Sequence, residues 1–436
     1  MSPRTVFAPY ARLFAVPGAS AFSLAGWLAR LPMPMVGLGT VLLIVGETGS
    51  YSLGGALSGT LALSFSVASP QWARAIDRRG QGAVLRWAAG CYLVFGLAFA
   101  GAVVADGPRW LWFVLAVLTG ASEPNIGALI RARWAHALDG EGRQTAFAFE
   151  SVVDEIVFIV GPPLVTLLAT LIAAPAGYLA GLLIGVSGGL WLAWQRASEP
   201  PVQPAGPAGA ARRSVLRTPT ILVVGAAYLA IGTVFGAVDV VVVGFARQQG
   251  APVMAGVVLA TYAAGSLVVG LVYGVARLPG TLAARYVACA VFFALAAQVL
   301  LAVGSLAVLV AAAFLAGLAI APVLVSGMSL VESRVPRQAL TEALTWTNTG
   351  LTLGVTAGSA IAGAAVDTWG ARAAFAVPAA AAGLAGLLAL AGAPLLRARP
   401  GRSPVPGSAH SSAPASGAGG SADRAHRNPA QERSAR

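Results

Sequence analysis

The stretch IVFIVGPPLVTLLATLIAAPAGYLAGLLIGVSGGLWLAWQ, residues 156–195, contains no charged residue. It is long enough for two membrane-spanning helices, because one helix needs about 20 apolar residues to cross the hydrocarbon core. Pro175 interrupts the stretch near its middle, where a tight turn between two spans is expected. A second charge-free stretch covers residues 286–331, and Gly304 interrupts it in the same way. The sequence therefore predicts an all-α integral membrane protein.

Composition gives the number of spans. The chain has 436 residues, of which 57% are hydrophobic and 10% charged, and this length accommodates about twelve spans with short connections. The apolar runs do not alternate with polar residues, so a membrane β-barrel is excluded. We expect spans at 14–46, 52–72, 83–105, 109–133, 145–171, 176–195, 219–246, 252–276, 286–304, 306–331, 342–366 and 370–396.

Arg30 lies in the middle of the first apolar stretch. The segments on either side of it are each too short to cross a bilayer, so one long helix carrying a buried arginine is expected. A charged side chain at membrane depth costs about 2.5 kcal/mol or more, and such residues usually face a cavity or an acidic partner. Arg30 is therefore a candidate for the transport pathway.

Arginine placement predicts the orientation. The net charge is +12, yet arginines concentrate on the two ends of the chain and on alternate connections, whereas Arg109, Arg247 and Arg372 lie on the opposite side. By the positive-inside rule both termini are cytoplasmic. The positive charge thus follows from topology, and no nucleic-acid partner is expected.

The chain divides into two halves. We expect a six-helix bundle in residues 1–195, a Pro/Ala/Gly-rich cytoplasmic linker in 196–218, a second six-helix bundle in 219–396 and a disordered cytoplasmic tail in 397–436. Pro124 in the fourth span corresponds to Pro322 in the tenth. Parallel six-helix repeats are an established transporter plan, with the substrate site between the halves.

The connection between spans two and three carries the sequence WARAIDRRGQGAVLR, residues 72–86. It resembles the loop signature of the major facilitator superfamily, Gly-x-x-x-Asp-Arg-x-Gly-Arg, although Ala73 and Gln81 depart from that pattern. The resemblance implies a twelve-helix secondary transporter over about residues 14–396. It also implies a conformational latch, a contact that holds one end of the transporter closed.

The latch residues implied by the resemblance are Asp77, Arg78 and Gly80, with Arg131 or Arg133 as one partner and the N-terminus of the eleventh span as the other. An acid at such a position can interact with the positive end of a helix and with arginines, and a solvated turn is the alternative.

Acids gather in span five, AFAFESVVDEIVFIVGPPLV, residues 146–165. Glu150, Asp154 and Glu155 share one helix face, and three acids there would be prohibitive against lipid, so this face should line a cavity. The sequence Gly161-Pro162 resembles the remnant of a fifth-helix motif of drug:proton antiporters in the superfamily.

Further pathway candidates lie in spans four and eleven. Glu123 is a second mid-span acid, with a structural salt bridge as the alternative. Span eleven carries uncharged polar residues, from which we expect substrate contacts: Trp346, Asn348, Thr349 and Thr352. We expect Arg30 to pair with Asp154 or Glu155, and next with Glu123, because these positions have similar estimated depth.

The favoured function is secondary active transport of a small organic solute across the cytoplasmic (inner) membrane by alternating access, with proton-coupled export preferred. Uptake or facilitated diffusion of a small polar solute is the alternative, and a non-transporting receptor is a weaker one. Enzyme motifs such as HExxH or a Walker loop do not occur, so no enzymatic activity is expected. Cys91 and Cys289 suggest no metal site. The expected partners are a small-molecule substrate, protons and the lipid bilayer, with no cofactor and a monomeric state.

Overall fold

The structure is a computed structural model that describes residues 13–202, 218–275, 279–335 and 340–397. Within these ranges the chain forms α-helices and short 3-10 turns and no strands. Twelve helical segments are long and apolar enough to cross a membrane, and this confirms the predicted all-α membrane fold. The expected linker and tail lie largely outside the described residues.

The helices of the first half are α2 (Ala19–Arg30), α3 (Pro32–Thr48), α4 (Tyr51–Arg79), α5 (Gln81–Val104), α6 (Arg109–Ala121), α7 (Ile126–Ala137), α8 (Gly140–Leu171) and α9 (Ala174–Trp194). Those of the second half are α10 (Pro219–Gln248), α11 (Met254–Val275), α12 (Leu282–Ala297), α13 (Leu306–Gly317), α14 (Ile320–Arg334), α15 (Leu340–Trp369), α16 (Ala371–Ala374), α17 (Ala376–Ala391) and α18 (Ala393–Arg397).

The first span is not the single continuous helix that was expected. It is interrupted at Leu31, between α2 and α3, immediately after Arg30. Pro32 begins the second piece, and its ring nitrogen cannot donate the hydrogen bond that would continue the helix. The two pieces still form one span, residues 19–48. The break therefore keeps the predicted number of spans while it places Arg30 at a helix end.

Spans four and ten are interrupted as well. The break between α6 and α7 covers Ser122–Asn125, and the break between α13 and α14 lies at Leu318–Ala319. Pro124 lies in the first of these breaks and Pro322 just after the second, in agreement with the correspondence of the two prolines in the sequence. The helix of the second span is longer than expected, because α4 remains helical beyond residue 72 as far as Arg79.

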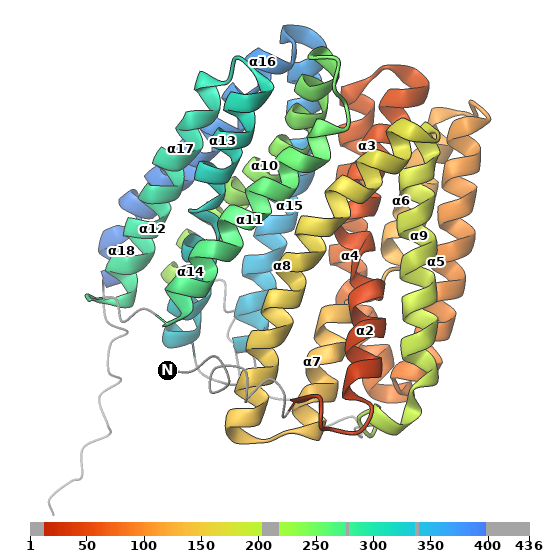
Figure 1. The fold of residues 1–436 in the computed structure, drawn as a ribbon. Helices are drawn as coiled ribbons and strands as arrows, with labels where there is room; N and C mark the ends of the chain where they lie inside the picture. The colour runs from red at the N-terminus through yellow and green to blue at the C-terminus, as the bar shows by residue number, and fades with distance from the viewer. Residues whose placement is uncertain (1–12, 203–217, 276–278, 336–339, 398–436) are drawn as a thin grey trace, which may run out of the picture. The chain divides into compact units, whose positions relative to one another are not determined.

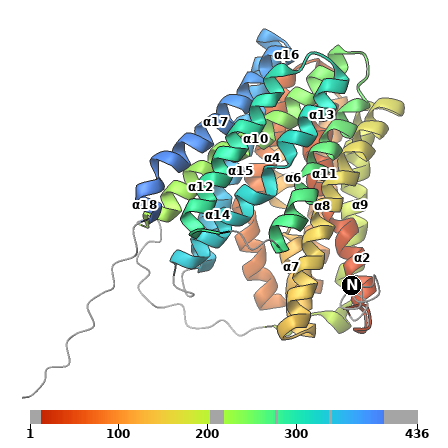
Figure 2. The same cartoon turned by 60° about the vertical axis from the view of Figure 1, so that its left-hand side comes forward.

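Helices of the first half pack mainly on one another, as do those of the second half (Figure 1). The halves meet along two helix pairs, α4 with α15 and α8 with α11, and the turned view shows the same neighbours (Figure 2).

We name the two ends of the spans by their turns. The Ser50 end, at the top of Figure 1, contains the turn between α3 and α4, and the Gly80 end contains the turn between α4 and α5.

Glycines allow α4 to touch α15 near the Ser50 end. A Cβ atom at Gly55 would lie 2.1 Å from the carbonyl oxygen of Ser359, and one at Gly59 would lie 2.9 Å from that of Thr356. Small residues let transmembrane helices approach this closely. The hydroxyl of Thr356 also donates to the carbonyl oxygen of Gly59 at 2.9 Å.

Toward the Gly80 end, α4 borders a pocket of about 650 Å³ that it shares with α6. Leu63, Val67 and Gln71 are among the residues of α4 that line it. Val67 is 62% exposed. Thus α4 contacts α15 near the Ser50 end and borders open space toward the Gly80 end.

Candidate functional site

Arg30 is the centre of a buried group of charges. Its side chain is 1% exposed. The guanidinium donates three hydrogen bonds: from Nε to the carbonyl oxygen of Gly26 at 3.0 Å, from Nη1 to Asp154 Oδ1 at 2.6 Å and from Nη2 to Glu150 Oε2 at 2.5 Å. A guanidinium is rigid and planar, so these contacts fix the position of α2 against α8.

The two carboxylates differ in their other partners. Glu150 is fully buried, and its Oε1 accepts a hydrogen bond from Trp134 Nε1 at 2.7 Å. Asp154 is 32% exposed, and its Oδ2 accepts from Arg131 Nη2 at 2.7 Å. The charges therefore alternate in the order Glu150, Arg30, Asp154, Arg131, and we call this set the charge ladder. Its two positive and two negative charges balance, with one end buried at Glu150 and the other partly exposed at Asp154 and Arg131.

Helix geometry explains how three helices build the charge ladder. Glu150 and Asp154 are four residues apart and therefore lie on one face of α8. Arg131 and Trp134 are three residues apart and lie on one face of α7. A Cβ atom at Gly26 would lie 2.5 Å from the side chain of Ile130, so glycine is needed for α2 to approach α7.

The structure joins Arg30 to Asp154, one of the two partners expected first, and to neither Glu155 nor Glu123. Glu155 is turned away by the 100° step between neighbouring helical residues, and it accepts a hydrogen bond from Ser266 Oγ of α11 at 3.3 Å. Glu123 lies in the break between α6 and α7 and does not reach Arg30. Glu150 is the partner that the sequence analysis overlooked, although its spacing from Asp154 was a usable signal.

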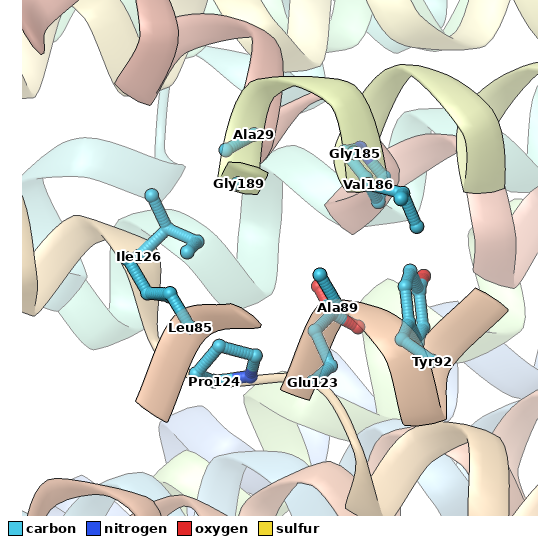
Figure 3. Close-up of a pocket in the computed structure, with 11 residues that line it drawn as sticks. Ala29, Leu85, Ala89, Tyr92, Glu123, Pro124, Ile126, Gly185, Val186 and Gly189 are labelled. Atoms are coloured by element: carbon cyan, nitrogen blue, oxygen red, sulfur yellow. The ribbon is translucent and has the colours of Figure 1, made fainter. Parts of the chain in front are cut away.

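Glu123 instead lines a small cavity of about 30 Å³ (Figure 3). Apart from Glu123 and Tyr92, the lining consists of apolar side chains and glycines, contributed by α2, α3, α5, α7 and α9 and by the break before α7. Tyr92 is 5% exposed. Its hydroxyl makes no hydrogen bond to any residue in the described ranges.

The polar residues of α15 lie apart from the charge ladder. Trp346 and Asn348 are exposed, and the hydroxyl of Thr352 donates to the carbonyl oxygen of Asn348 at 3.1 Å. Thr349 is half-buried. The hydrogen bond of Thr352 stays within α15 and does not involve Arg30 or its partners. Their role in substrate contact stays a prediction.

Within the described residues, the turn at the Gly80 end makes no latch contact through Asp77. Asp77 and Arg78 are exposed, and Asp77 makes no ion pair or hydrogen bond within the part of the chain that the structure describes. Arg131 is engaged by Asp154. The expected partner at the start of span eleven adjoins residues 336–339, which lie outside the described ranges.

Arg133, the second arginine considered for the latch, has a different role. It is buried, and its guanidinium donates to Gln81 Oε1 at 2.8 Å, to Ser198 Oγ at 2.7 Å and to the carbonyl oxygens of Leu192 and Gln195, each at 3.0 Å. Arg133 therefore connects α7 to the beginning of α5 and to the end of α9.

Gly80 is required by the backbone. Its φ angle is +85°, a conformation that side chains with a Cβ rarely adopt. A Cβ there would also lie 2.6 Å from Glu199 Oε1. The same carboxylate oxygen accepts a hydrogen bond from the backbone N–H of Gly82 at 3.0 Å. This turn therefore contacts the beginning of the segment that follows the first half.

A contact between the halves closes the Ser50 end, and the sequence analysis missed it. The carboxylate of Asp367 at the end of α15 accepts hydrogen bonds from the backbone N–H groups of Tyr51 and Ser52, at 3.0 and 2.8 Å, and from Ser50 Oγ at 3.3 Å. Backbone N–H groups are free at a helix N-terminus, which also carries partial positive charge. Arg247 adds a hydrogen bond from Nη1 to the carbonyl oxygen of Val45 at 3.3 Å.

Comparison with known proteins places these features in a family. The chain matches the model of the Major Facilitator Superfamily over residues 18–279 and again over residues 227–424. No curated protein sequence matches it.

Solved transporter structures share the fold. The nucleoside transporter NupG is 15% identical, with a TM-score of 0.66 over 86% of this chain and 99% of that one. An auto-inhibited POT family peptide transporter is 13% identical, with a TM-score of 0.67 over 88% and 97%. A bacterial homologue of the iron transporter ferroportin in an inward-facing state is 17% identical, with a TM-score of 0.60 over 85% and 97%. At these identities the likeness concerns the fold alone.

Proposed function

The chain belongs to the major facilitator superfamily and is a multi-pass membrane transporter, and we propose that it exports a small organic solute across the cytoplasmic membrane in exchange for protons. Residues 1–195 and 219–396 act as the two units that rock about the substrate site, and a monomer is sufficient for this cycle. The solved relatives transport nucleosides and peptides, according to their names. The fold therefore accommodates several solute classes and does not by itself select one.

The charge ladder is the observation that carries the proposal. Arg30 and Glu150 are sealed, whereas Asp154 and Arg131 are about one-third exposed. A solute that reaches the open end meets one carboxylate and one guanidinium. Because Asp154 is shared by both arginines, a solute group that binds Asp154 or Arg131 changes the contacts of Arg30 as well. Solute binding would therefore alter how α2, α7 and α8 pack against one another.

Exchange with protons requires that bound solute weakens the binding of protons and that a bound proton weakens the binding of solute. Binding sites coupled in this way change each other's affinity by the same factor. A solute with a cationic or hydrogen-bond-donating group would take Asp154 as its acceptor, which suits an exporter. The Gly161-Pro162 sequence supports the same direction by resemblance, and in the structure Gly161 packs against Pro34 of the first span, where a Cβ would lie 2.5 Å from the proline ring.

Solute-dependent proton movement tests the proposal. The purified chain is reconstituted into liposomes that contain a pH-sensitive dye, and a panel of sugars, amino acids and amphiphilic drugs is applied with an imposed proton gradient. We expect at least one solute to move outward as protons move inward, and Asp154→Asn to reduce that exchange. Asp106→Asn is the matched control, because Asp106 is an exposed acid in a turn.

The alternative function has its own outcome. If the chain is an uptake permease or a facilitator, Arg131 and Arg30 would anchor an anionic solute. Solute would then equilibrate without opposing proton movement, or would enter together with protons. Either result excludes proton-coupled export.

A further inference from the structure

The charge ladder leaves some membrane-embedded acids without a positive partner. Arg30 and Arg131 balance Glu150 and Asp154. Protonating Asp154 would therefore break ion pairs with both arginines. In the described part of the spans, by contrast, Glu123 has no cation and no hydrogen-bond partner. Its carboxyl group can gain or lose a proton without breaking an ion pair.

The cavity beside Glu123 is large enough to hold a water molecule. Its volume of about 30 Å³ exceeds the roughly 10 to 15 Å³ that a cavity needs for this, and a buried water needs two to four polar partners. Glu123 offers two carboxyl oxygens, and the buried Tyr92 hydroxyl has no other partner among the described residues. Figure 3 shows that both side chains project into the same space, Tyr92 from α5 and Glu123 from the break in span four, toward α9.

We propose that Glu123, Tyr92 and one bridging water form a proton-binding site that is separate from the charge ladder. An unpaired carboxylate is costly in apolar surroundings, and the neutral acid avoids that cost while it donates to the water. Besides Tyr92, the titratable neighbour of Glu123 is Tyr178 of α9, whose hydroxyl donates to the carbonyl oxygen of Gly96. No charged side chain other than Glu123 lines the cavity.

The break in the first span connects the Glu123 site to Arg30 of the charge ladder, where the solute is proposed to bind. Ala29 and Pro32 line the cavity, whereas Arg30, which lies between them, points to the carboxylates of α8. A change in the cavity therefore acts on the same helix ends that hold Arg30. The inference rests on the proposed function, because it names the residue that carries the exchanged proton.

Infrared difference spectroscopy of the full chain tests the site with protons alone as the ligand. A protonated carboxyl group has a C=O stretch that a carboxylate lacks. We expect a pH step to change such a band in the wild-type protein, Glu123→Gln to remove it, and Tyr92→Phe to keep it at a shifted frequency because the water loses one partner. Glu155→Gln is the matched control, since Glu155 is a half-buried acid of the same half, and it should leave the Glu123 band unchanged.

Some outcomes overturn the site. A band that persists unchanged in Glu123→Gln assigns the proton to another acid, and an unshifted band in Tyr92→Phe excludes the shared water. Should Glu123→Gln fail to fold, Glu123→Asp replaces it and must shift the band. The spectrum is independent of transport: absent proton movement in wild-type liposomes overturns the proposed function, whereas a persistent band overturns only the site.

Discussion

At the scale of single residues, the position of Arg30 is decided by partners on other helices. Arg30 has two carboxylate partners. If the arginine is removed, the two carboxylates keep different hydrogen-bond partners. Asp154 would keep Arg131, whereas Glu150 would keep only the indole N–H of Trp134. Glu150 is fully buried. The cost of losing Arg30 therefore falls on Glu150.

We predict that Arg30→Ala abolishes transport and lowers stability by about 3 to 5 kcal/mol, the cost of leaving one member of a buried ion pair unpaired. The double variant Arg30→Ala/Glu150→Gln should recover much of the expression level and of the thermal unfolding midpoint, although not transport. Arg30→Ala/Asp154→Asn is the matched control and should recover less. Equal recovery in the two double variants would contradict the unequal roles of the two acids.

At the scale of helices, the ends of α4 carry two acid contacts with opposite expected effects. Asp367 caps the N-terminus of α4 from the other half of the molecule and holds the Ser50 end together. Asp77 lies near the C-terminus of α4 and is exposed in this state. In alternating access one end closes as the other opens, so a contact at either end stabilises one of the two states.

Asp367→Asn should weaken closure of the Ser50 end. A charge at a helix N-terminus contributes about 0.3 to 2 kcal/mol, so the balance between the two states should shift by up to about thirtyfold. Spin labels at positions 47 and 369, which are exposed at this end on opposite halves, measure the separation directly. We expect a larger population at long distance, and an unchanged distribution would show that Asp367 does not stabilise this state.

Asp77→Asn should have the opposite effect on the same pair of labels. If Asp77 closes the Gly80 end in the other state, its neutralisation favours the state described here, and the long-distance population should fall. Transport should slow while solute binding is largely retained, because Asp77 lies far from the charge ladder in sequence and takes no part in it. Wild-type transport kinetics in this variant would make Asp77 a solvated turn residue.

At the scale of the whole molecule, the distribution of arginines predicts which end faces the cytoplasm, and the fold alone does not reveal it. In a background without Cys91 and Cys289, a cysteine at Ala208 in the expected linker should be protected from an impermeant thiol reagent in intact cells. A cysteine at Glu47 should react. Glu47 is preferable to Ser50 at this end, since Ser50 donates a hydrogen bond to Asp367. Labelling of Ala208→Cys from outside would reverse the orientation.

That orientation decides which side of the membrane the pocket beside α4 faces. If the Gly80 end is cytoplasmic, the structure represents a state open to the cytoplasm, in which Asp77 is expected to have released its partner. The exposed side chains at positions 67 and 71 would then line the access route.

The number of spans, their approximate limits and the family could be predicted from the amino-acid sequence. Apolar length and charge placement are local properties that each segment carries alone, so residues 156–195 and 286–331 could be assigned without knowing their neighbours. The acids of span five could likewise be recognised as facing the interior, because lipid would exclude them.

Which of these groups contact one another depends on how the helices pack, and this could not be predicted from the sequence. Ser122–Asn125 interrupt the helix of span four, so a helical projection of that span fails there, and Pro32 begins a new helix directly after Leu31 in span one. The choice of Glu150 over Glu155 depends on a 100° step on α8, and the contact of Asp367 with α4 joins residues more than 300 positions apart. Such pairings arise from the rotation and approach of whole helices, which no single segment encodes.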